Sequence, residues 1–322
     1  MSAALSFRQV SCGFDGKTIV DNASFDIAAG EIVCLLGPSG CGKTTSLRLA
    51  AGMEKPMGGE IYLGDACVAG EGVFVPPEAR GIGFLFQDFA LFPHLSVLDN
   101  VTFGLRGLAA EEKKSRAHSL LASVGLSDLA KKFPATLSGG EQQRAALARA
   151  MAPRPKLVLM DEPFSNLDPQ LRDQMRDLTL RLLRENGAAG LIVTHDVADA
   201  LRMADRIAVQ KDGKVLQMDT PKALFENPIN LHVASMFGPV NMMPDHAHQA
   251  VRPADVGFFD SADCVVLEGE VTAKRFMGRD VLCDITLSGG EAWQAITPIE
   301  LAPDLGTHKI FVPHARLMLF KS

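Results

Sequence analysis

A glycine-rich run of eight residues has the composition of a phosphate-binding loop: Gly37-Pro38-Ser39-Gly40-Cys41-Gly42-Lys43-Thr44, which fits the pattern G-x-x-x-x-G-K-[ST]. Glycines let backbone N–H groups approach a phosphate closely, Lys43 supplies a charge for the β- and γ-phosphates, and Thr44 offers a hydroxyl to Mg²⁺. The pattern alone has false positives, so the elements on either side of it must show whether it is a phosphate-binding loop. Ile32–Leu36 predicts a buried strand before the loop, and Thr44–Ala51 predicts a helix after it. The sequence therefore predicts a site for a nucleotide and Mg²⁺.

Two adjacent carboxylates follow the apolar run Leu157–Met160. Because that predicted strand ends at this point, both side chains can turn toward one site. Asp161 fits the carboxylate on the Mg²⁺ side, and Glu162 fits the group that orients and activates an attacking water. His195 follows a further apolar strand, at the carboxyl edge where parallel-sheet sites lie. Taken alone it is best explained as a solvated histidine before a helix; beside the other motifs we expect it to contact the γ-phosphate.

The elements that must hold these residues alternate between strands and helices up to about Met236, which predicts an α/β domain with a mostly parallel sheet. Pro239, Pro244 and His246-Ala247-His248 predict a linker. Short alternating runs beyond it, with turns expected at Gly269, Gly278 and 288–290, predict a small all-β, barrel-like domain. We expect domains at 1–237 and 238–322, with a helical subdomain at about 88–152. The His-x-His pair is interpreted as solvated rather than metal-binding.

Composition excludes several classes of protein. A length of 322 residues favours two domains. The excess of acidic residues, 38 against 32 basic ones, argues against general electrostatic binding to nucleic acid. The longest apolar runs are far shorter than the roughly 20 residues of a membrane span, so we expect a soluble chain made in the cytosol, with any membrane part on other chains. The six cysteines form no CxxC pair and predict neither zinc nor disulfides, although Cys41 is a candidate reactive thiol.

A second motif makes the phosphate loop specific. Leu137-Ser138-Gly139-Gly140-Glu141-Gln142-Gln143-Arg144 resembles the signature of the ABC ATPase family. Gln87 resembles that family's Q-loop glutamine, Ser165-Asn166-Leu167-Asp168 its D-loop, and His195 its switch histidine. Phe14 lies where the family places an aromatic residue, commonly tyrosine, that stacks on adenine. The resemblance covers roughly Leu5 to Phe237. It implies a P-loop ATPase that converts ATP and water to ADP and phosphate, coupled to transport as a translocase.

The signature predicts a second anion site, since Ser138, Gly139 and Gly140 precede an expected helix Glu141–Met151 whose positive end would face a phosphate. In the family, the signature of one subunit closes over the ATP of the other, so the resemblance implies a homodimer with two ATP molecules between its subunits. The implied catalytic residues are Glu162, His195, Gln87 and Lys43. The implied Mg²⁺ residues are Thr44, Gln87 and Asp161. The implied nucleotide contacts are Phe14, Gly37, Pro38, Ser39, Gly40, Cys41, Gly42, Lys43, Thr44, Thr45, Ser138, Gly139, Gly140, Glu141 and Asp168.

Two further segments narrow the family. Phe86-Gln87 is followed by Leu91-Phe92-Pro93-His94-Leu95-Ser96-Val97, and Val251-Arg252-Pro253 opens the β-rich tail. Both resemble the bacterial importers of ferric iron, sulfate, polyamines or sugars, and the tail looks closest to ferric-iron importers. Spermidine, sulfate, phosphonate and maltose-type sugar remain open. The resemblance implies two transmembrane permease subunits, a periplasmic substrate-binding protein and a peripheral place on the cytoplasmic face of the inner membrane. The tail is interpreted as a dimer clamp, with sensor and ligand-binding roles open.

Some alternatives remain. A non-transport ABC ATPase acting on nucleic acid is disfavoured by the acidic charge and by the lack of a coiled-coil insert or second ATPase copy. Glu162 and His195 disfavour a module that binds ATP without hydrolysing it, and the importer-like tail disfavours an exporter. Leu287-Ser288-Gly289-Gly290-Glu291 repeats five letters of the signature, but it lies between two β-like runs without Gln-Gln-Arg. We predict a hairpin turn there with no nucleotide role.

Overall fold

The structure is a computed structural model that describes residues 3–105, 107–244, 246–259 and 263–320. The chain forms two compact units, Met1–Pro221 and Lys222–Ser322. The segment 222–237, which the sequence pattern groups with the ATPase domain, thus belongs by its contacts to the second unit. In the described part of the chain, no helix is long and apolar enough to cross a membrane.

A six-stranded sheet forms the centre of the first unit, in the order β11-β10-β3-β9-β8-β7. Five of its strands are parallel and β11 is antiparallel to β10. The bounds are β3 Ile32–Leu36, β7 Gly83–Leu85, β8 Leu157–Asp161, β9 Ala189–Thr194, β10 Arg206–Lys211 and β11 Lys214–Asp219. Every residue of β3 and β9 is buried, as expected of parallel strands covered on both faces. The carboxyl ends of β3, β8 and β9 therefore meet at one edge of the sheet.

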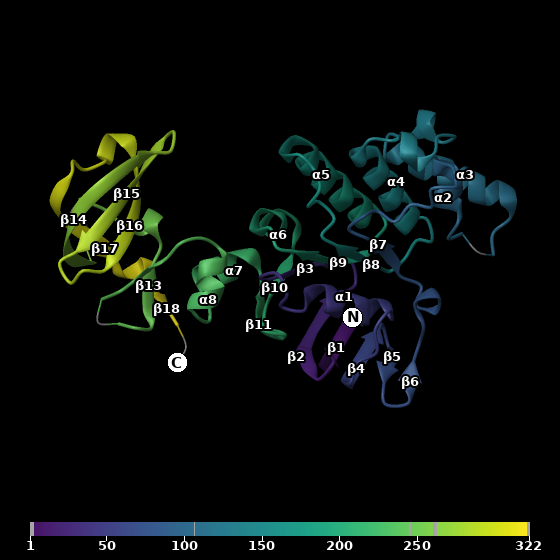
Figure 1. Cartoon of the computed structure of the whole chain (residues 1–322), viewed down its shortest axis with the longest axis horizontal. Coiled ribbons are helices and arrows are strands. Elements are labelled where there is room, and N and C mark those ends of the chain that lie inside the picture. Colours follow the sequence, from purple (N-terminus) through teal and green to yellow (C-terminus); the bar gives the residue numbers. More distant parts are fainter. Residues whose placement is uncertain (1–2, 106, 245, 260–262, 321–322) are drawn as a thin grey trace. The chain divides into compact units, whose positions relative to one another are not determined.

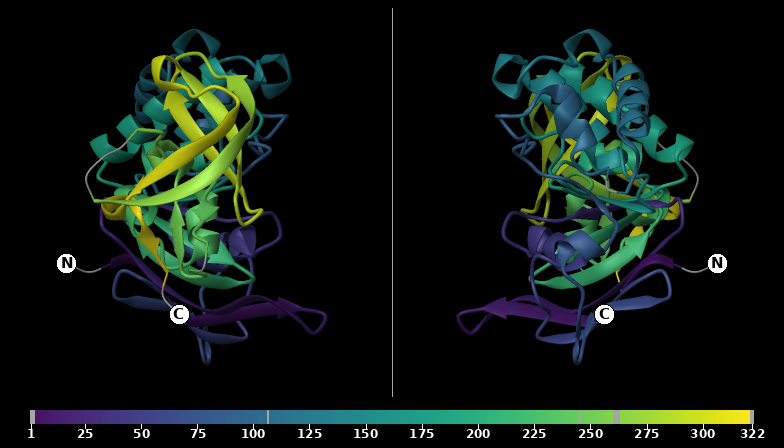
Figure 2. Two further views of the ribbon diagram at one scale, coloured as in Figure 1. Left: turned by 90° about the vertical axis from the view of Figure 1, so that its left-hand side faces the viewer. Right: turned by 90° about the vertical axis from the view of Figure 1, so that its right-hand side faces the viewer.

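A second, antiparallel sheet has the order β2-β1-β4-β5-β6. Its bounds are β1 Ala3–Phe14, β2 Lys17–Ala28, β4 Gly58–Leu63, β5 Ala66–Gly70 and β6 Val73–Phe74. Helix α1 (Lys43–Ala51) lies between the two sheets, and all three contribute to one apolar core (Figure 1). The β1–β2 hairpin projects beyond the rest of its sheet (Figure 2). It turns through Asp15 and Gly16, both at positive φ, as a tight two-residue hairpin requires.

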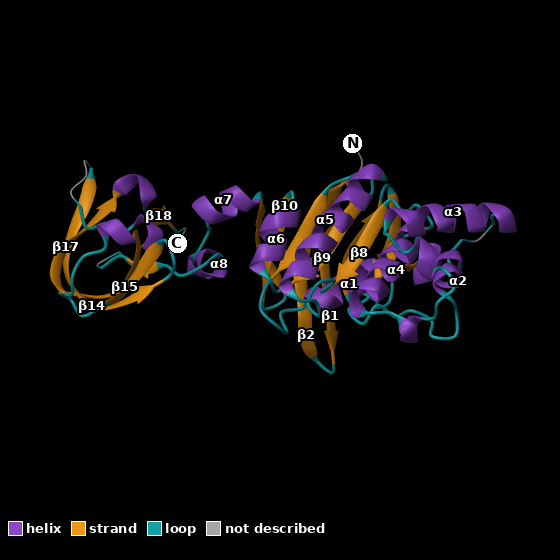
Figure 3. Cartoon of the chain, turned by 90° about the horizontal axis from the view of Figure 1, so that it is seen from above, coloured by secondary structure: helices purple, strands orange, loops and turns teal. Residues whose placement is uncertain are grey.

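The other helices of this unit are α2 Val97–Thr102, α3 Ala110–Ser123, α4 Gly139–Met151, α5 Pro169–Glu185 and α6 Val197–Met203. Helices α5 and α6 lie on the opposite face of the parallel sheet from α1 (Figure 1). Helices α2, α3 and α4 pack together at one end of the unit (Figure 3). Helix α3 stops at Ser123, close to Gly125, which takes a positive φ of 68°. A separate 3₁₀ turn follows at Ser127–Leu129, with others at Pro77–Ala79 and Pro134–Thr136.

The second unit is β-rich, as predicted, and begins with two short helices. Its bounds are α7 Pro221–Glu226, α8 Leu231–Met236, β12 Asn241–Met242, β13 Gln249–Val251, β14 Cys264–Phe276, β15 Asp280–Leu287, β16 Ala292–Pro298, β17 Gly306–Pro313 and β18 Met318–Leu319. The strands form two antiparallel sheets, β12-β13-β18 and β16-β15-β14-β17. Three 3₁₀ turns lie at Pro253–Asp255, Ile299–Leu301 and His314–Arg316. A core around Val271, Ile285, Trp293 and Ile310 holds the larger sheet.

Two sequence predictions for this unit are wrong. Gly269 is not a turn but lies inside β14, where a Cβ would come within 3.0 Å of Ile310, Ile285 and Thr286. A glycine is needed there for close packing of neighbouring strands. The expected linker is part of the fold, because β12 pairs with β13 across the turn that carries His246 and His248. No group of three or more potential metal-binding side chains occurs in the described ranges.

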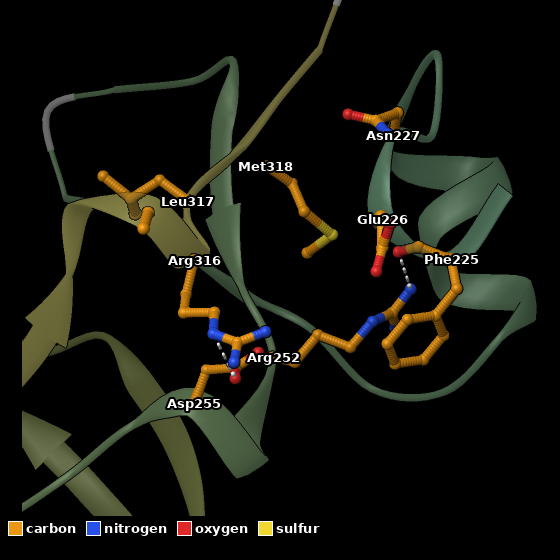
Figure 4. A pocket seen from close by; sticks show the side chains of 9 residues that line it. Phe225, Glu226, Asn227, Arg252, Asp255, Arg316, Leu317 and Met318 are labelled. Carbon is orange, nitrogen blue, oxygen red and sulfur yellow. Dashed lines mark hydrogen bonds and ion pairs between the residues drawn. The ribbon is translucent and has the colours of Figure 1, made fainter. Parts of the chain in front are cut away.

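The Val-Arg-Pro motif has a structural role, because Arg252 links neighbouring segments of the second unit (Figure 4). Its guanidinium lies over the ring of Phe225, 4.1 Å from the centroid, and donates to the carbonyls of Phe225, Ala234 and Gly238 at 3.3, 3.1 and 3.4 Å. Burial lowers the pKa of Arg252. The side chain therefore ties the two short helices to β13, beside a cavity of about 300 Å³.

Candidate functional site

The glycine-rich loop after β3 needs glycine for two different reasons. Gly42 has a φ of 100°, which residues with a side chain rarely adopt, and it immediately precedes α1. Gly37 has no room for a side chain, because a Cβ would lie 2.2 Å from the carbonyl oxygen of Gln210 on β10. Helix α1 starts without a side-chain cap, so its N-terminal N–H groups remain available to an anion. The shape of this backbone therefore fits the predicted phosphate-binding loop.

Lys43 is buried, with 5% of its surface exposed, and its ammonium lies inside the curl of this loop. Its Nζ donates to the carbonyl oxygens of Gly37 and Pro38 at 2.8 and 2.9 Å, and lies 3.9 Å from the Sγ of Cys41. Burial raises the pKa of the Cys41 thiol, and the Lys43 charge lowers it. Because burial is the larger effect, Cys41 lacks the depressed pKa of a reactive thiolate.

Thr44 and Asp161 come together from different elements. The Thr44 hydroxyl, in the first turn of α1, donates to Oδ1 of Asp161 at the end of β8, at 3.0 Å. Burial raises the pKa of Asp161, while the Thr44 hydrogen bond lowers it. A desolvated carboxylate beside a hydroxyl offers the hard oxygen ligands that Mg²⁺ prefers. The pair therefore fits the predicted Mg²⁺ position.

Glu162 and His195 also come together. His195 Nδ1 lies 3.1 Å from Glu162 Oε2, and the two residues follow the paired strands β8 and β9. Glu162 has a positive φ of 42°, its N–H donates to Val193 O at 3.0 Å, and its carbonyl accepts the Ser165 hydroxyl at 3.0 Å. The strained turn is held by these bonds, and it directs the carboxylate toward His195. A small cavity of about 40 Å³ lies beside the pair.

The signature starts a helix rather than preceding one, so the expected start at Glu141 is wrong. Ser138 is the N-cap of α4, and Gly139 and Gly140 form its first turn. The Ser138 hydroxyl accepts from Glu141 N at 3.4 Å, and Ser138 N donates to Glu141 Oε2 at 2.7 Å, which makes a capping box. Hydrogen bonds from Ser138 lower the pKa of Glu141. The Glu141 charge therefore occupies part of the helix end that was expected to attract a phosphate.

The D-loop segment, Ser165–Asp168, connects β8 to α5. Asp168 caps α5, where its Oδ1 accepts from Leu171 N at 3.0 Å. Gln143 is fully buried on α4, and its Nε2 donates to Pro163 O at 2.5 Å, next to Glu162. This bond links the signature helix to the loop that carries the carboxylate. The sequence predicts no role for Gln143, because its burial and its bond to Pro163 depend on how α4 packs.

Among the described residues, Gln87 and Phe14 make no contact with the other candidate site residues. Gln87 is exposed after β7, and Phe14 is 46% exposed at the end of β1. The turn after Gln87 is well held: Arg149 on α4 donates to the carbonyls of Phe89 and Ala90 at 2.9 and 2.5 Å. Both carbonyl residues have positive φ.

An apolar groove of about 340 Å³ lies beside this turn. The rings of Phe92 and Phe103 pack within it, with centroids 4.4 Å apart. Phe92 and Leu95 are only half-buried, whereas Phe103 is 58% exposed. The groove is lined by Ile82, Phe84, Phe86, Ala90, Gly104, Arg149, Ala150 and Pro153 in addition to the two rings and Gly83.

The family model for ABC transporters matches residues 20–165. The Fe(3+) ions import ATP-binding protein FbpC 2 of Haemophilus influenzae is 37% identical over 319 residues, which cover 90% of this chain and 89% of that protein. The chain belongs to the ABC transporter family. Two further members are the spermidine/putrescine import ATP-binding protein PotA of Marinobacter nauticus, 46% identical over 76% of this chain and 65% of that protein, and the trehalose/maltose import ATP-binding protein MalK of Thermococcus litoralis, 44% identical over 71% and 63%.

Solved structures of ABC proteins share the fold. One is an ATP-binding cassette in a dimeric post-hydrolysis state bound to ADP and Pi; it is 33% identical, with a TM-score of 0.59 over 67% of this chain and 98% of that chain. Another is cbiO1 of Clostridium perfringens, 29% identical, with a TM-score of 0.64 over 70% and 91%. The chain is thus an ABC ATPase with a β-rich C-terminal unit, and it binds and hydrolyses ATP.

Proposed function

We propose that this chain is the ATP-hydrolysing subunit of a binding-protein-dependent importer, and that two copies close around two ATP molecules. The observation that carries the proposal is the convergence of Lys43, Thr44–Asp161 and Glu162–His195 at one edge of the parallel sheet. These side chains supply a phosphate cradle, hard oxygen ligands and a water-activating carboxylate within one small region.

Each residue has a role in hydrolysis. The Lys43 ammonium exchanges its two loop carbonyls for phosphate oxygens, which keeps a buried cation paired throughout. Glu162 accepts the proton of the attacking water, and His195 holds the carboxylate in place while its far edge faces the γ-phosphate. Thr44, Asp161 and Gln87 are the residues that would hold Mg²⁺. When bound there, Mg²⁺ neutralises charge that builds up on the phosphates.

The dimer follows from the signature. Ser138 and Gly139 are exposed, and a Cβ on Gly139 would meet no atom of this chain within 4 Å. Because these exposed residues lie at the N-terminus of a helix, their backbone can bind the phosphates of a partner's ATP. Phe14 is proposed to stack on adenine, Asp168 to lie at the same dimer face, and Pro38, Ser39, Gly40, Cys41 and Thr45 to complete the nucleotide contacts.

Two transmembrane permease subunits are the proposed membrane partners. The apolar groove beside Phe92 and Phe103 is the surface we assign to them, because its exposed aromatic ring suits an apolar helix from another chain. A periplasmic binding protein would deliver the solute to the permease. The chain would then lie on the cytoplasmic face of the bacterial inner membrane.

Ferric iron is the proposed solute, with spermidine as the second candidate. The relative named as an iron importer aligns over 90% of this chain, including most of the C-terminal unit. Relatives named as spermidine/putrescine importers are more similar, at 43–46% identity, but align over 75–87%. The nucleotide-binding unit is shared by importers of many solutes, so the wider alignment is the better guide. ATPase rates of the reconstituted complex, with binding proteins loaded with Fe³⁺ or spermidine in turn, test the choice.

The dimer is tested with Glu162→Gln. This change removes the base but keeps the size of the side chain, so the ATPase rate should fall by about 100-fold or more and ATP should hold the protein as a dimer in size-exclusion chromatography. Glu291→Gln, in the turn that repeats the signature letters, is the matched control and should remain as active as wild type. A strictly monomeric Glu162→Gln protein that binds no ATP contradicts the proposal.

A further inference from the structure

Arg172, in the first turn of α5, lies between the loop after β8 and the loop after β9. Its Nη1 is 2.9 Å from Asp196 Oδ2, and its Nη2 donates to Leu167 O at 3.2 Å. Leu167 belongs to the loop that starts at Glu162, and Asp196 follows His195 directly. One guanidinium therefore touches both loops that carry the hydrolytic pair.

We infer that Arg172 is a positioning residue for ATP hydrolysis: it fixes the loop bearing His195 against the loop bearing Glu162 and Asp168. The inference rests on the proposed function. Because Asp168 is assigned to the dimer face, any shift of this loop on dimer closure passes through Arg172 to Asp196 and so to His195. Neither the phosphate loop nor the Thr44–Asp161 pair touches Arg172 through a hydrogen bond between described residues.

Both oxygens of the Asp196 carboxylate accept hydrogen bonds, so Asp196 is held in one orientation toward Arg172. Oδ1 accepts from Ala198 N at 2.7 Å and Asp199 N at 3.2 Å, and so caps α6; Oδ2 receives Arg172. The planar guanidinium fork can serve a carboxylate and a carbonyl together, whereas a lysine ammonium is a point charge on a flexible stem. The two side chains are 26% and 29% exposed, so their pair is shielded more than an open surface pair.

The neighbouring ion pairs of Arg172 are formed by residues of α5, of α6 and of the loop before α6. Asp199 pairs with Arg176, which leaves Asp196 as the carboxylate partner of Arg172. Burial raises the pKa of Asp199, and the Arg176 guanidinium lowers it. Arg202 on α6 pairs with Asp173 on α5 at 2.5 Å, and these side chains are 50% and 48% exposed. This second α5–α6 pair makes no hydrogen bond to either loop among the described residues and provides a matched control; Asp173 also accepts from Arg176 at 2.6 Å.

The experiment compares Arg172→Ala, Arg172→Lys and Arg202→Ala in the full-length chain. For Arg172→Ala we expect kcat to fall by about tenfold or more, since a positioned pair is lost, while KM for ATP changes less than about twofold. Arg172→Lys should recover only part of kcat. Arg202→Ala should keep kcat within about twofold of wild type, because exposed ion pairs contribute little. ATP-dependent dimers in the Glu162→Gln background should form with and without Arg172→Ala.

A double-mutant cycle with Asp196→Asn supplies a readout that a general structural role would not move. Asparagine keeps a capping oxygen for α6 but removes the charge that pairs with Arg172. The kcat of the double mutant should match that of Arg172→Ala alone. Additive losses, full recovery by lysine, or equal effects of Arg172→Ala and Arg202→Ala would each overturn the inference. A wild-type protein without ATPase activity would instead overturn the proposed function, so the two failures are distinguishable.

Discussion

The imidazole of His195 and the carboxylate of Glu162 lie 3.1 Å apart, from Nδ1 to Oε2, although the two residues are 33 positions apart in the sequence (195 − 162). Their proximity follows from strand register, because Asp161 on β8 is opposite Val193 on β9. Glu162 follows Asp161 directly and His195 follows Val193 by two residues, so both side chains lie where the two strands leave the sheet at the same edge. A parallel sheet thus places a base and its orienting group together without any direct sequence signal between them.

His195→Ala should slow hydrolysis without weakening ATP binding. The change leaves Glu162 without its partner, so its carboxylate is no longer held toward the water, and we expect kcat to fall by about 100-fold. Equilibrium binding of a fluorescent ATP analogue should stay within about twofold of wild type, because Lys43 and the glycine loop are untouched. Steady-state phosphate release measures kcat.

His118→Ala is the matched control, since His118 is exposed on α3, far in the chain from either strand. It should leave kcat unchanged. If His195→Ala and His118→Ala gave the same rate, the Glu162–His195 contact would have no catalytic role.

The two Leu-Ser-Gly-Gly-Glu segments should respond differently to the same substitution. Ser138 caps α4, so Ser138→Ala should cost about 1 kcal/mol of stability and lower ATPase activity. Ser288 lies in the β15–β16 turn, where its hydroxyl donates to Glu268 O at 3.1 Å, and Ser288→Ala should leave ATPase activity unchanged. Thermal denaturation and phosphate release measure both effects, and loss of activity in the Ser288 variant alone would contradict the assignment.

These identical segments also show how far the sequence can be interpreted. Leu137 and Leu287 are both buried and both are followed by Ser-Gly-Gly-Glu, yet one segment starts a helix and the other closes a hairpin. The flanking residues predict the difference, because Gln-Gln-Arg and small apolar residues continue a helix while alternating residues continue strands. Motif context, rather than the motif, predicted the fold correctly here.

Contacts between distant positions were beyond prediction. The Gln143–Pro163 and Arg172–Asp196 bonds depend on how α4, α5 and α6 pack, and nothing in local propensity or periodicity specifies that packing. Gly269 illustrates the same limit. A glycine flanked by Glu268 and Glu270 predicts a turn from local rules, but in the fold it makes room for Ile310.

Gly139→Ala should separate dimer formation from stability. A Cβ at Gly139 meets nothing within this chain, and alanine is favoured over glycine in a helix, so the melting temperature should stay the same or rise. The methyl group would, however, face the partner's nucleotide in the proposed dimer. We therefore expect ATP-dependent dimer formation in the Glu162→Gln background to weaken by about tenfold, as measured by analytical ultracentrifugation.

Gly140→Ala is the contrasting variant for that prediction, because its Cβ would approach Leu171 of the same chain at 2.6 Å. Leu171 must move to admit it, so this change should lower the melting temperature. Unaltered dimer formation by Gly139→Ala would mean that the signature does not face a partner's nucleotide.

Glu31→Gln should destabilise the first unit in a pH-dependent way. Glu31 Oε1 and Oε2 accept from Arg206 at 2.5 and 2.9 Å, and Oε2 also accepts from Ala28 N at 2.7 Å. The Arg206 hydrogen bond holds the pKa of Glu31 below its ordinary value, against the opposing effect of burial. A carboxyl group with a lowered folded-state pKa stabilises the fold above its unfolded-state pKa, and this contribution is lost as pH falls through the folded-state pKa. At pH 7 the substitution should therefore cost about 1–3 kcal/mol, and the difference from wild type should shrink below about pH 4.

Thermal unfolding by circular dichroism at pH 7 and pH 3.5 measures the Glu31 effect. Trp293, the only tryptophan, lies in the second unit, so its fluorescence provides an internal control whose transition should not change. Glu71→Gln, at an exposed position, is the control for removing a negative charge. A destabilisation by Glu31→Gln that stayed constant between the two pH values would contradict the assigned pKa direction, because it would mean that the charge on Glu31 does not stabilise the fold.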